Sequence, residues 1–192
     1  RSEYDALKKQ AKQGTGDLSL PKSNALIYAA DYQTTIVDRQ LLIKATISIR
    51  QFRQRLTIID LPLSGLAVES AQLNQQPAMI ARSASKTQML QLFSQKSGEH
   101  QLVLQLSAPL NTVGSDQVSQ FQLLPGVASQ FKIELPEKQH LIVNELKVKP
   151  LDAAGKAVSY EFPIGGNGQV VLKLTEQSRE QTNDSLIFAR SG

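Results

Sequence analysis

The sequence contains no cysteine and no tryptophan, and aromatic residues make up only 5% of it. The absence of cysteine excludes disulfides, thiolate metal sites and thiol catalysis, and it fits both oxidising and reducing compartments. No run of about 18 apolar residues occurs, so we expect no membrane-spanning helix. No signal peptide is visible. Because the chain begins with Arg1 rather than methionine, we expect any export signal or anchor to lie upstream.

Excess charge is also small. The 21 basic and 17 acidic residues give a net charge of +4, and they are spread along the chain. Nucleic-acid-binding domains concentrate basic residues on one face, so we predict no nucleic-acid partner. With 192 residues, 41% of them hydrophobic, the chain can bury the core of one large domain or of two small ones.

What the chain does contain is hydrophobic alternation with a period of two. In residues 41–50 every second side chain is apolar; the set is Leu41, Ile43, Ala45, Ile47 and Ile49. Successive side chains of a strand point to opposite faces, so this stretch predicts a strand. The same alternation recurs in residues 101–107, 131–135 and 169–174. One apolar and one polar face is typical of antiparallel sheets with one side in solvent.

Turn-forming residues separate these stretches at residues 74–77, 96–99, 152–155 and 165–168. We interpret residues 96–99 as a hairpin between strands at 89–93 and 101–106, and residues 165–168 as a glycine-rich hairpin turn. In residues 66–73 the apolar phase changes, and a β-bulge near Glu69 and Ser70 would keep the apolar side chains on one face.

These patterns predict an all-β fold, namely an antiparallel β-sandwich of the immunoglobulin-like or jelly-roll-like kind. Residues 1–13 carry a capping pattern and a narrow apolar stripe, which predict a short N-terminal helix. We therefore assign residues 1–23 to a short helix and linker and residues 24–192 to the sandwich domain. If the sandwich has two lobes, the polar stretch 111–120 separates them into residues 24–112 and 117–192.

Recognisable catalytic motifs are lacking. His100 and His140 are the only histidines; no G-x-S-x-G elbow accompanies them, and we interpret both as surface or strand-end residues. The glycine-rich turn lacks the Lys-Ser/Thr pair of a phosphate-binding loop. We predict no catalytic residue, no cofactor and no metal ligand. Two alternatives stay open: a calcium site built from separate loops, and a glycoside-active enzyme that uses two facing carboxylates.

Two groups of residues are candidates for ligand binding. Tyr28 and Tyr32 lie four residues apart in one predicted strand and therefore share a face, where they would offer a stacking platform for a glycan or pack at a sheet edge. Arg50, Arg53 and Arg55 form the densest basic cluster. This cluster would bind an anionic surface or cover a strand end in solvent.

The order of several segments resembles an N-terminal β-sandwich segment found in large uncharacterised bacterial cell-envelope proteins. The resemblance covers about residues 24–136. It rests on residues 25–32, 61–63, 67–78, 98–104, 121–125 and 133–136, which read ALIYAADY, LPL, AVESAQLNQQPA, GEHQLVL, FQLLP and IELP. These are strand and turn patterns, and they imply an extracytoplasmic location, a larger parent chain and a scaffold or interaction role.

The sequence thus predicts a non-catalytic module of a larger bacterial envelope protein, periplasmic or at the cell surface. We expect its partners to be other envelope proteins or other domains of the parent chain, contacted through exposed edge strands. The alternative is a glycan-binding module that uses Tyr28 and Tyr32.

Overall fold

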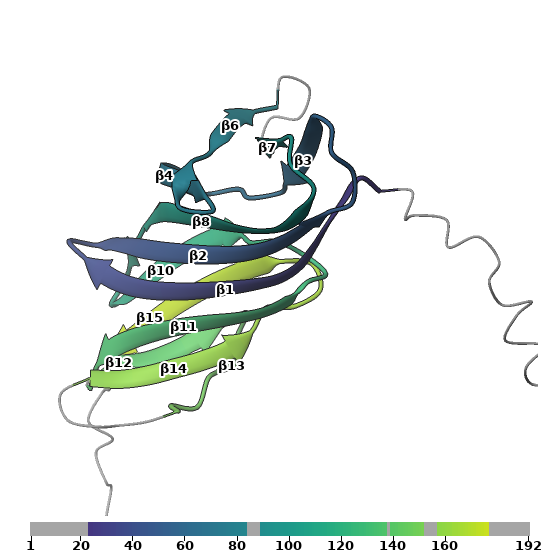
Figure 1. The fold of residues 1–192 in the computed structure, drawn as a ribbon. Helices are drawn as coiled ribbons and strands as arrows, with labels where there is room; N and C mark the ends of the chain where they lie inside the picture. The colour runs from purple at the N-terminus through teal and green to yellow at the C-terminus, as the bar shows by residue number, and fades with distance from the viewer. Residues whose placement is uncertain (1–22, 84–88, 138, 152–156, 177–192) are drawn as a thin grey trace, which may run out of the picture.

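The computed structural model describes residues 23–83, 89–137, 139–151 and 157–176, and every regular element in these ranges is a β-strand (Figure 1). The all-β class predicted from the sequence is therefore confirmed. The short helix predicted for residues 1–13 and the turn predicted at residues 152–155 lie outside the described residues. No described segment forms a helix long and apolar enough to cross a bilayer.

The largest sheet has seven strands. In order across the sheet they are β14 (Ala157–Pro163), β11 (Ala128–Pro136), β1 (Ala25–Val37), β2 (Gln40–Gln51), β8 (Gly98–Pro109), β4 (Ala67–Leu73) and β5 (Gln76–Pro77). All neighbours are antiparallel except β1 and β11, which run parallel. The predicted antiparallel arrangement therefore holds for most of the sheet but not for this pair.

Two smaller sheets contain the other described strands. The five-stranded sheet contains β13 (Leu146–Lys147), β12 (Gln139–Val143), β15 (Gln169–Glu176), β10 (Asp116–Gln122) and β9 (Asn111–Val113). The three-stranded sheet contains β3 (Thr57–Leu61), β7 (Leu90–Ser94) and β6 (Met79–Arg82). Figure 1 shows the five-stranded sheet behind the large sheet and the three-stranded sheet at its upper end. Immunoglobulin-like and jelly-roll sandwiches are built from two antiparallel sheets, so the third sheet and the parallel pair distinguish this topology from both.

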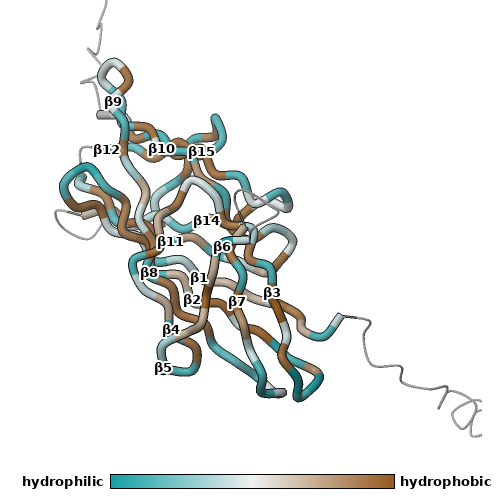
Figure 2. Tube along the Cα trace, turned by 90° about the horizontal axis from the view of Figure 1, so that it is seen from above, coloured by the Kyte–Doolittle hydropathy of each residue, from teal (hydrophilic) through white to brown (hydrophobic). Residues whose placement is uncertain are grey.

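The hydrophobic core forms one cluster to which all three sheets contribute. Strands from both sides of the polar stretch 111–120 share the seven-stranded sheet, since β11 and β14 lie beside β1. Figure 2 shows brown apolar and teal polar segments following one another along the strands. The described residues therefore share a single core.

The alternation read from the sequence is confirmed in four strands. The apolar side chains of the predicted pattern are all buried, namely Leu41, Ile43, Ala45, Ile47 and Ile49 in β2, Leu102, Leu104 and Leu106 in β8, Phe131, Ile133 and Leu135 in β11, and Val170, Leu172 and Leu174 in β15. Each large apolar side chain buried in this way stabilises the fold by about 1.5–3 kcal/mol. The predicted bulge is also confirmed, because the β4–β8 register shifts between Val68 and Ser70 and leaves Glu69 as the extra residue.

Two of the predicted hairpins are wrong in their pairing. β7 and β8, which flank residues 95–97, belong to different sheets; β7 pairs with β3, and β8 pairs with β2. The pair β2–β8 therefore continues into the pair β3–β7 around a corner formed by residues 52–56 and 95–97. Residues 165–168 do form a turn, closed by Gly168 N–H donating to Gly165 C=O at 2.9 Å, but this turn joins β14 of one sheet to β15 of another.

Candidate functional site

Tyr28 and Tyr32 do not share a face, so this part of the sequence prediction is wrong. The β1–β2 register shifts between Ile27 and Ala29, which places an extra residue in β1 and reverses the alternation between the two tyrosines. Tyr32 is 0% exposed, whereas Tyr28 is exposed on the outer face of the large sheet. The two rings therefore cannot form one stacking platform for a glycan.

Tyr32 instead belongs to an aromatic cluster in the core. The centroid of Phe131 lies 6.3 Å from that of Tyr32, 6.1 Å from that of Phe121 and 5.1 Å from that of Phe162. The Tyr32 hydroxyl oxygen accepts a hydrogen bond from the Leu124 N–H at 3.3 Å. Burial raises the pKa of Tyr32 to about 12, because the charged phenolate would lose its hydration in this site.

Tyr28 forms a polar group with Glu99 and Arg50 on the outer face. Its hydroxyl donates to Glu99 Oε2 at 2.9 Å, and Arg50 Nη1 lies 3.1 Å from Glu99 Oε1. The hydrogen bond to the Glu99 carboxylate raises the pKa of the Tyr28 hydroxyl. All three side chains are exposed, and surface pairs of this kind contribute little to stability.

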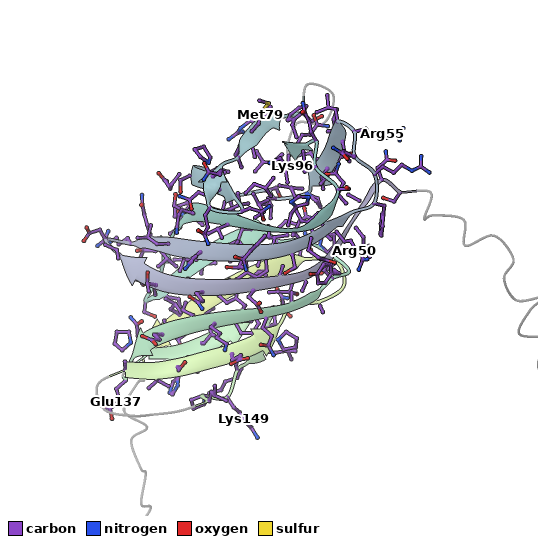
Figure 3. The ribbon with its side chains drawn as sticks, in the orientation of Figure 1. Arg50, Arg55, Met79, Lys96, Glu137 and Lys149 are labelled. Carbon is purple, nitrogen blue, oxygen red and sulfur yellow. The ribbon has the colours of Figure 1, made fainter. Side chains whose placement is uncertain are left out.

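The structure divides the arginine cluster between two places. Arg50 lies in β2 on the outer face of the large sheet, while Arg53 and Arg55 lie in the corner segment that precedes β3. Arg55 Nη2 donates to Asn24 Oδ1 at 2.6 Å. Figure 3 shows Arg50 and Arg55 at the same end of the molecule, where β1 begins.

Gln51 holds this corner in place, although it is not among the functional residues predicted from the sequence. Its side chain is buried, and its Nε2 donates to the carbonyls of Arg53 and Arg55 at 2.9 Å and 3.0 Å and contacts Thr57 Oγ1 at 3.2 Å. The signal was present, since position 51 continues the inward phase of residues 41–49. A glutamine at an inward position needs hydrogen-bond partners; the corner carbonyls supply them for Nε2, while Oε1 is buried without a partner among the described residues.

A cleft of about 590 Å³ opens beside this corner, and we call it the β3 cleft. Three separate parts of the chain line it: residues 23–27, residues 57–60 with Pro62, and residues 124–127. Both polar and apolar atoms face the cleft, and it is open to solvent on one side. Leu26 and Ile58, two of its lining residues, are each 53% exposed.

A second cavity, of about 580 Å³, lies between the β12–β13 hairpin and β14. Its floor is mainly apolar and includes Val148, Val158 and Tyr160. The Tyr160 hydroxyl donates to the Gln139 C=O at 3.1 Å, and burial raises the pKa of this hydroxyl. These contacts tie the edge of the large sheet to the five-stranded sheet.

The two histidines have ordinary surroundings. His100 is buried near the start of β8, where its Nε2 lies 2.6 Å from the Lys96 C=O and its Nδ1 lies 2.9 Å from Asn74 Nδ2. These partners fit the tautomer that carries hydrogen on Nε2. His140 is half-buried in β12. In the described part of the chain, no group of three or more His, Cys, Asp or Glu side chains is placed to hold a metal ion.

Comparison with known proteins identifies the fold but not a family. No protein-family model matches the chain, and no curated protein matches it either. Among solved structures, yeast LTA4 hydrolase matches 86% of this chain with a TM-score of 0.51 and 11% identity. A mutant M1 zinc metallopeptidase from Deinococcus radiodurans, solved with a Tyr-Ser-Ala substrate, matches 78% with a TM-score of 0.50 and 15% identity. The match spans 32% and 42% of those two chains.

Proposed function

We propose that this chain is a β-sandwich module of a larger bacterial envelope protein and that it binds other domains of the parent chain or other envelope proteins, without chemistry of its own. The β3 cleft carries this proposal. It combines exposed apolar side chains with a strand that, among the described strands, has a partner on one side only, as expected of a surface that binds polypeptide.

The fold comparison supports a modular role. In both of the larger proteins named above, a fold of this kind accounts for less than half of the chain. A domain that forms part of a longer chain normally contacts its neighbours through an interface of its own. The envelope location rests on the sequence resemblance alone.

Site-specific photo-crosslinking in the full-length parent protein tests the proposal. A photoreactive amino acid at position 58 in β3, or at position 146 in β13, samples two apolar residues that are both exposed, at 53% and 73%. We expect position 58 to give crosslinks to another domain or to a second protein, in an envelope fraction of the cell. If neither position gave crosslinks, or if the parent protein were recovered in the cytoplasm, the proposal would be refuted.

A further inference from the structure

Among the described strands, β3 has a neighbour on one side only, and residues of β3 line the β3 cleft. β3 is an edge strand of its sheet, and its partner among the described strands is β7. Residues 57–60 line the cleft along nearly the whole five-residue strand, which is about 17 Å long. At Thr57, Ile58 and Ile59, the N–H and C=O groups that point away from β7 have no strand partner among the described residues, so this part of the edge can receive an added strand.

A second stretch of strand backbone, at the start of β1, lines the same cleft. β1 starts pairing with β2 at Ala25, whereas its pairing with β11 begins only at Ala29. The first residues of β1 thus extend beyond the start of β11, and residues 25–27 line the cleft. The Ala25 C=O accepts a hydrogen bond from Ser23 Oγ, whereas Leu26 and Ile27 have a described strand partner on the β2 side only. An extended polypeptide in the cleft can therefore meet strand backbone on β3 and also on β1.

Side chains around the cleft suit a strand with alternating apolar residues. Ile58 and Leu26 are both half exposed and both line the cleft. In strand addition the backbone hydrogen bonds hold the added segment, and its alternate side chains fill apolar sites on the host. Ile58 lies near the middle of β3, where such contact would be most shielded from water.

Charge distinguishes the two ends of β3. At the end nearest the corner, the Arg55 guanidinium is held at the rim of the cleft by Asn24, which is a neutral partner and a lining residue. Arg53 is exposed, and no ion pair with another described residue is recorded for it. At the other end Asp60 contributes a carboxylate that accepts a hydrogen bond from Gln91. A segment with an acidic residue at the Arg55 end complements this arrangement.

We propose that the β3 cleft receives an extended segment of a second polypeptide, which adds to the outer edge of β3 at residues 57–59, places apolar side chains against Ile58 and Leu26, and sets an acidic residue against Arg53 and Arg55. This inference rests on the proposed function, because it specifies the kind of partner that the module binds. It makes the corner that Gln51 organises part of the binding surface.

Titration of the ¹⁵N-labelled full chain with two synthetic peptides tests the inference by NMR. The probes are acetyl-Asp-Asp-Val-Thr-Val-Thr-Val-amide and the same peptide with Lys-Lys in place of Asp-Asp. We expect the acidic peptide to shift the amide signals of residues 25–27 and 57–61 and to bind at least about fivefold more tightly than the basic one. This preference should shrink as salt is added, because the arginines are exposed.

Three variants separate the contribution of charge at Arg55 from that of apolar contact at Ile58. Arg55→Glu leaves one positive and one negative side chain at this end of β3, so it should abolish the preference between the two peptides, whereas Ile58→Lys should weaken both by at least about tenfold. Met79→Lys is the matched control: Met79 is an exposed apolar residue on β6, the opposite edge of the same sheet, and its replacement should change neither affinity. All three positions are exposed, so the variants are expected to fold, and their thermal unfolding verifies this.

Several results would overturn the inference. One is equal affinity for both peptides, and another is a set of amide-signal shifts confined to β6. A third is self-association of the chain that Ile58→Lys abolishes, which would make a second copy of the chain the occupant of the cleft. Amide-exchange protection along the outer edge of β3 without peptide would assign the cleft to this chain's own residues. If crosslinks arise from position 146 and not from position 58, the module function stands while the β3 cleft loses its role.

Discussion

Asn74 and Asn144 occupy the same position in two hairpin turns and make the same hydrogen bonds to a neighbouring strand. Their φ angles are 50° and 49°. The backbone N–H of Asn74 donates to the Gln101 C=O, and that of Asn144 donates to the Val171 C=O, each at 2.9 Å. Each side-chain Oδ1 then accepts from the N–H of that same residue, at 2.9 Å and 2.8 Å. Each asparagine thereby extends the pairing of its strand by one residue.

Replacing either asparagine by alanine should lower the free energy of unfolding by about 1–3 kcal/mol, as measured by urea denaturation. The substitution removes the side-chain hydrogen bonds and places a residue with a Cβ at positive φ without local compensation. Asp38→Ala is the control, because Asp38 starts the β1–β2 turn with a φ of 46° but has no recorded side-chain bond to a neighbouring strand among the described residues. Asp38→Ala should lower the free energy of unfolding by only about 1 kcal/mol. If all three substitutions lowered it equally, the hydrogen bonds from the asparagines to the neighbouring strands would not be the cause.

The second position of these turns offers a stabilising change. Gln75 and Glu145 have φ angles of 66° and 68°, where a side chain is disfavoured and glycine is not. Gln75→Gly should therefore raise the free energy of unfolding by up to about 1 kcal/mol. Gln76→Gly, one residue further on and inside β5, should instead lower it. If both substitutions had the same sign, backbone strain at position 75 would not be the cause.

Local pattern predicted those parts of the fold in which inward and outward side chains differ in polarity. The β2 alternation and the bulge at Glu69 are visible because a wrong phase would bury polar residues. The bulge in β1 could not be predicted in this way, because Ile27, Tyr28 and Ala29 can each lie on the inner or the outer face of the sheet without burying a charged group. The hairpin expected at residues 96–99 was wrong for another reason: strand pairing depends on β2 and β3, which lie about 40 residues earlier in the chain.

The turn at residues 165–168 depends on a glycine that no other residue can replace. At Gly168, φ is +72° and an added Cβ would lie 2.2 Å from the Leu123 C=O oxygen, while the Leu123 N–H donates to the Gly168 C=O at 2.8 Å. Gly168→Ala should cost more than about 3 kcal/mol or prevent folding. At Gly114, φ is +64° and the space around it is open, so Gly114→Ala should cost only about 1 kcal/mol. Equal melting temperatures for the two variants would contradict the steric argument.

Tyr32 should dominate the alkaline limit of stability. Its pKa of about 12 lies above the value of about 10 for an unfolded tyrosine, so the protonated form is favoured in the fold. The stability linked to this pKa is complete below pH 10 and is lost as the pH rises from 10 to 12, by about 3 kcal/mol in total. Ultraviolet titration should show one tyrosine ionising near pH 12. Tyr32→Phe should abolish that step and lower stability at pH 7 by about 1–3 kcal/mol, because the Leu124 N–H loses its acceptor.

The β3 cleft itself could not be predicted from the sequence, because its walls come from three segments that are distant in the chain. Only the basic character of residues 50–55 gave a local signal. From the sequence its three arginines form one cluster, whereas the structure places them on two surfaces. The corner that separates them depends on one buried amide, which is a question of packing rather than of pattern.

The buried amide of Gln51 should protect the corner from proteolysis. Gln51 Nε2 occupies the carbonyls of Arg53 and Arg55, and these are the carbonyls that trypsin must attack to cleave after either arginine. Gln51→Met keeps the size of the side chain and removes its donor, so the corner should open more often and cleavage there should accelerate by about tenfold or more. Gln54→Met, at an exposed position in the same segment, should leave the rate unchanged. Mass spectrometry of the fragments assigns the cut sites, and equal acceleration in both variants would mean that Gln51 does not hold the corner closed.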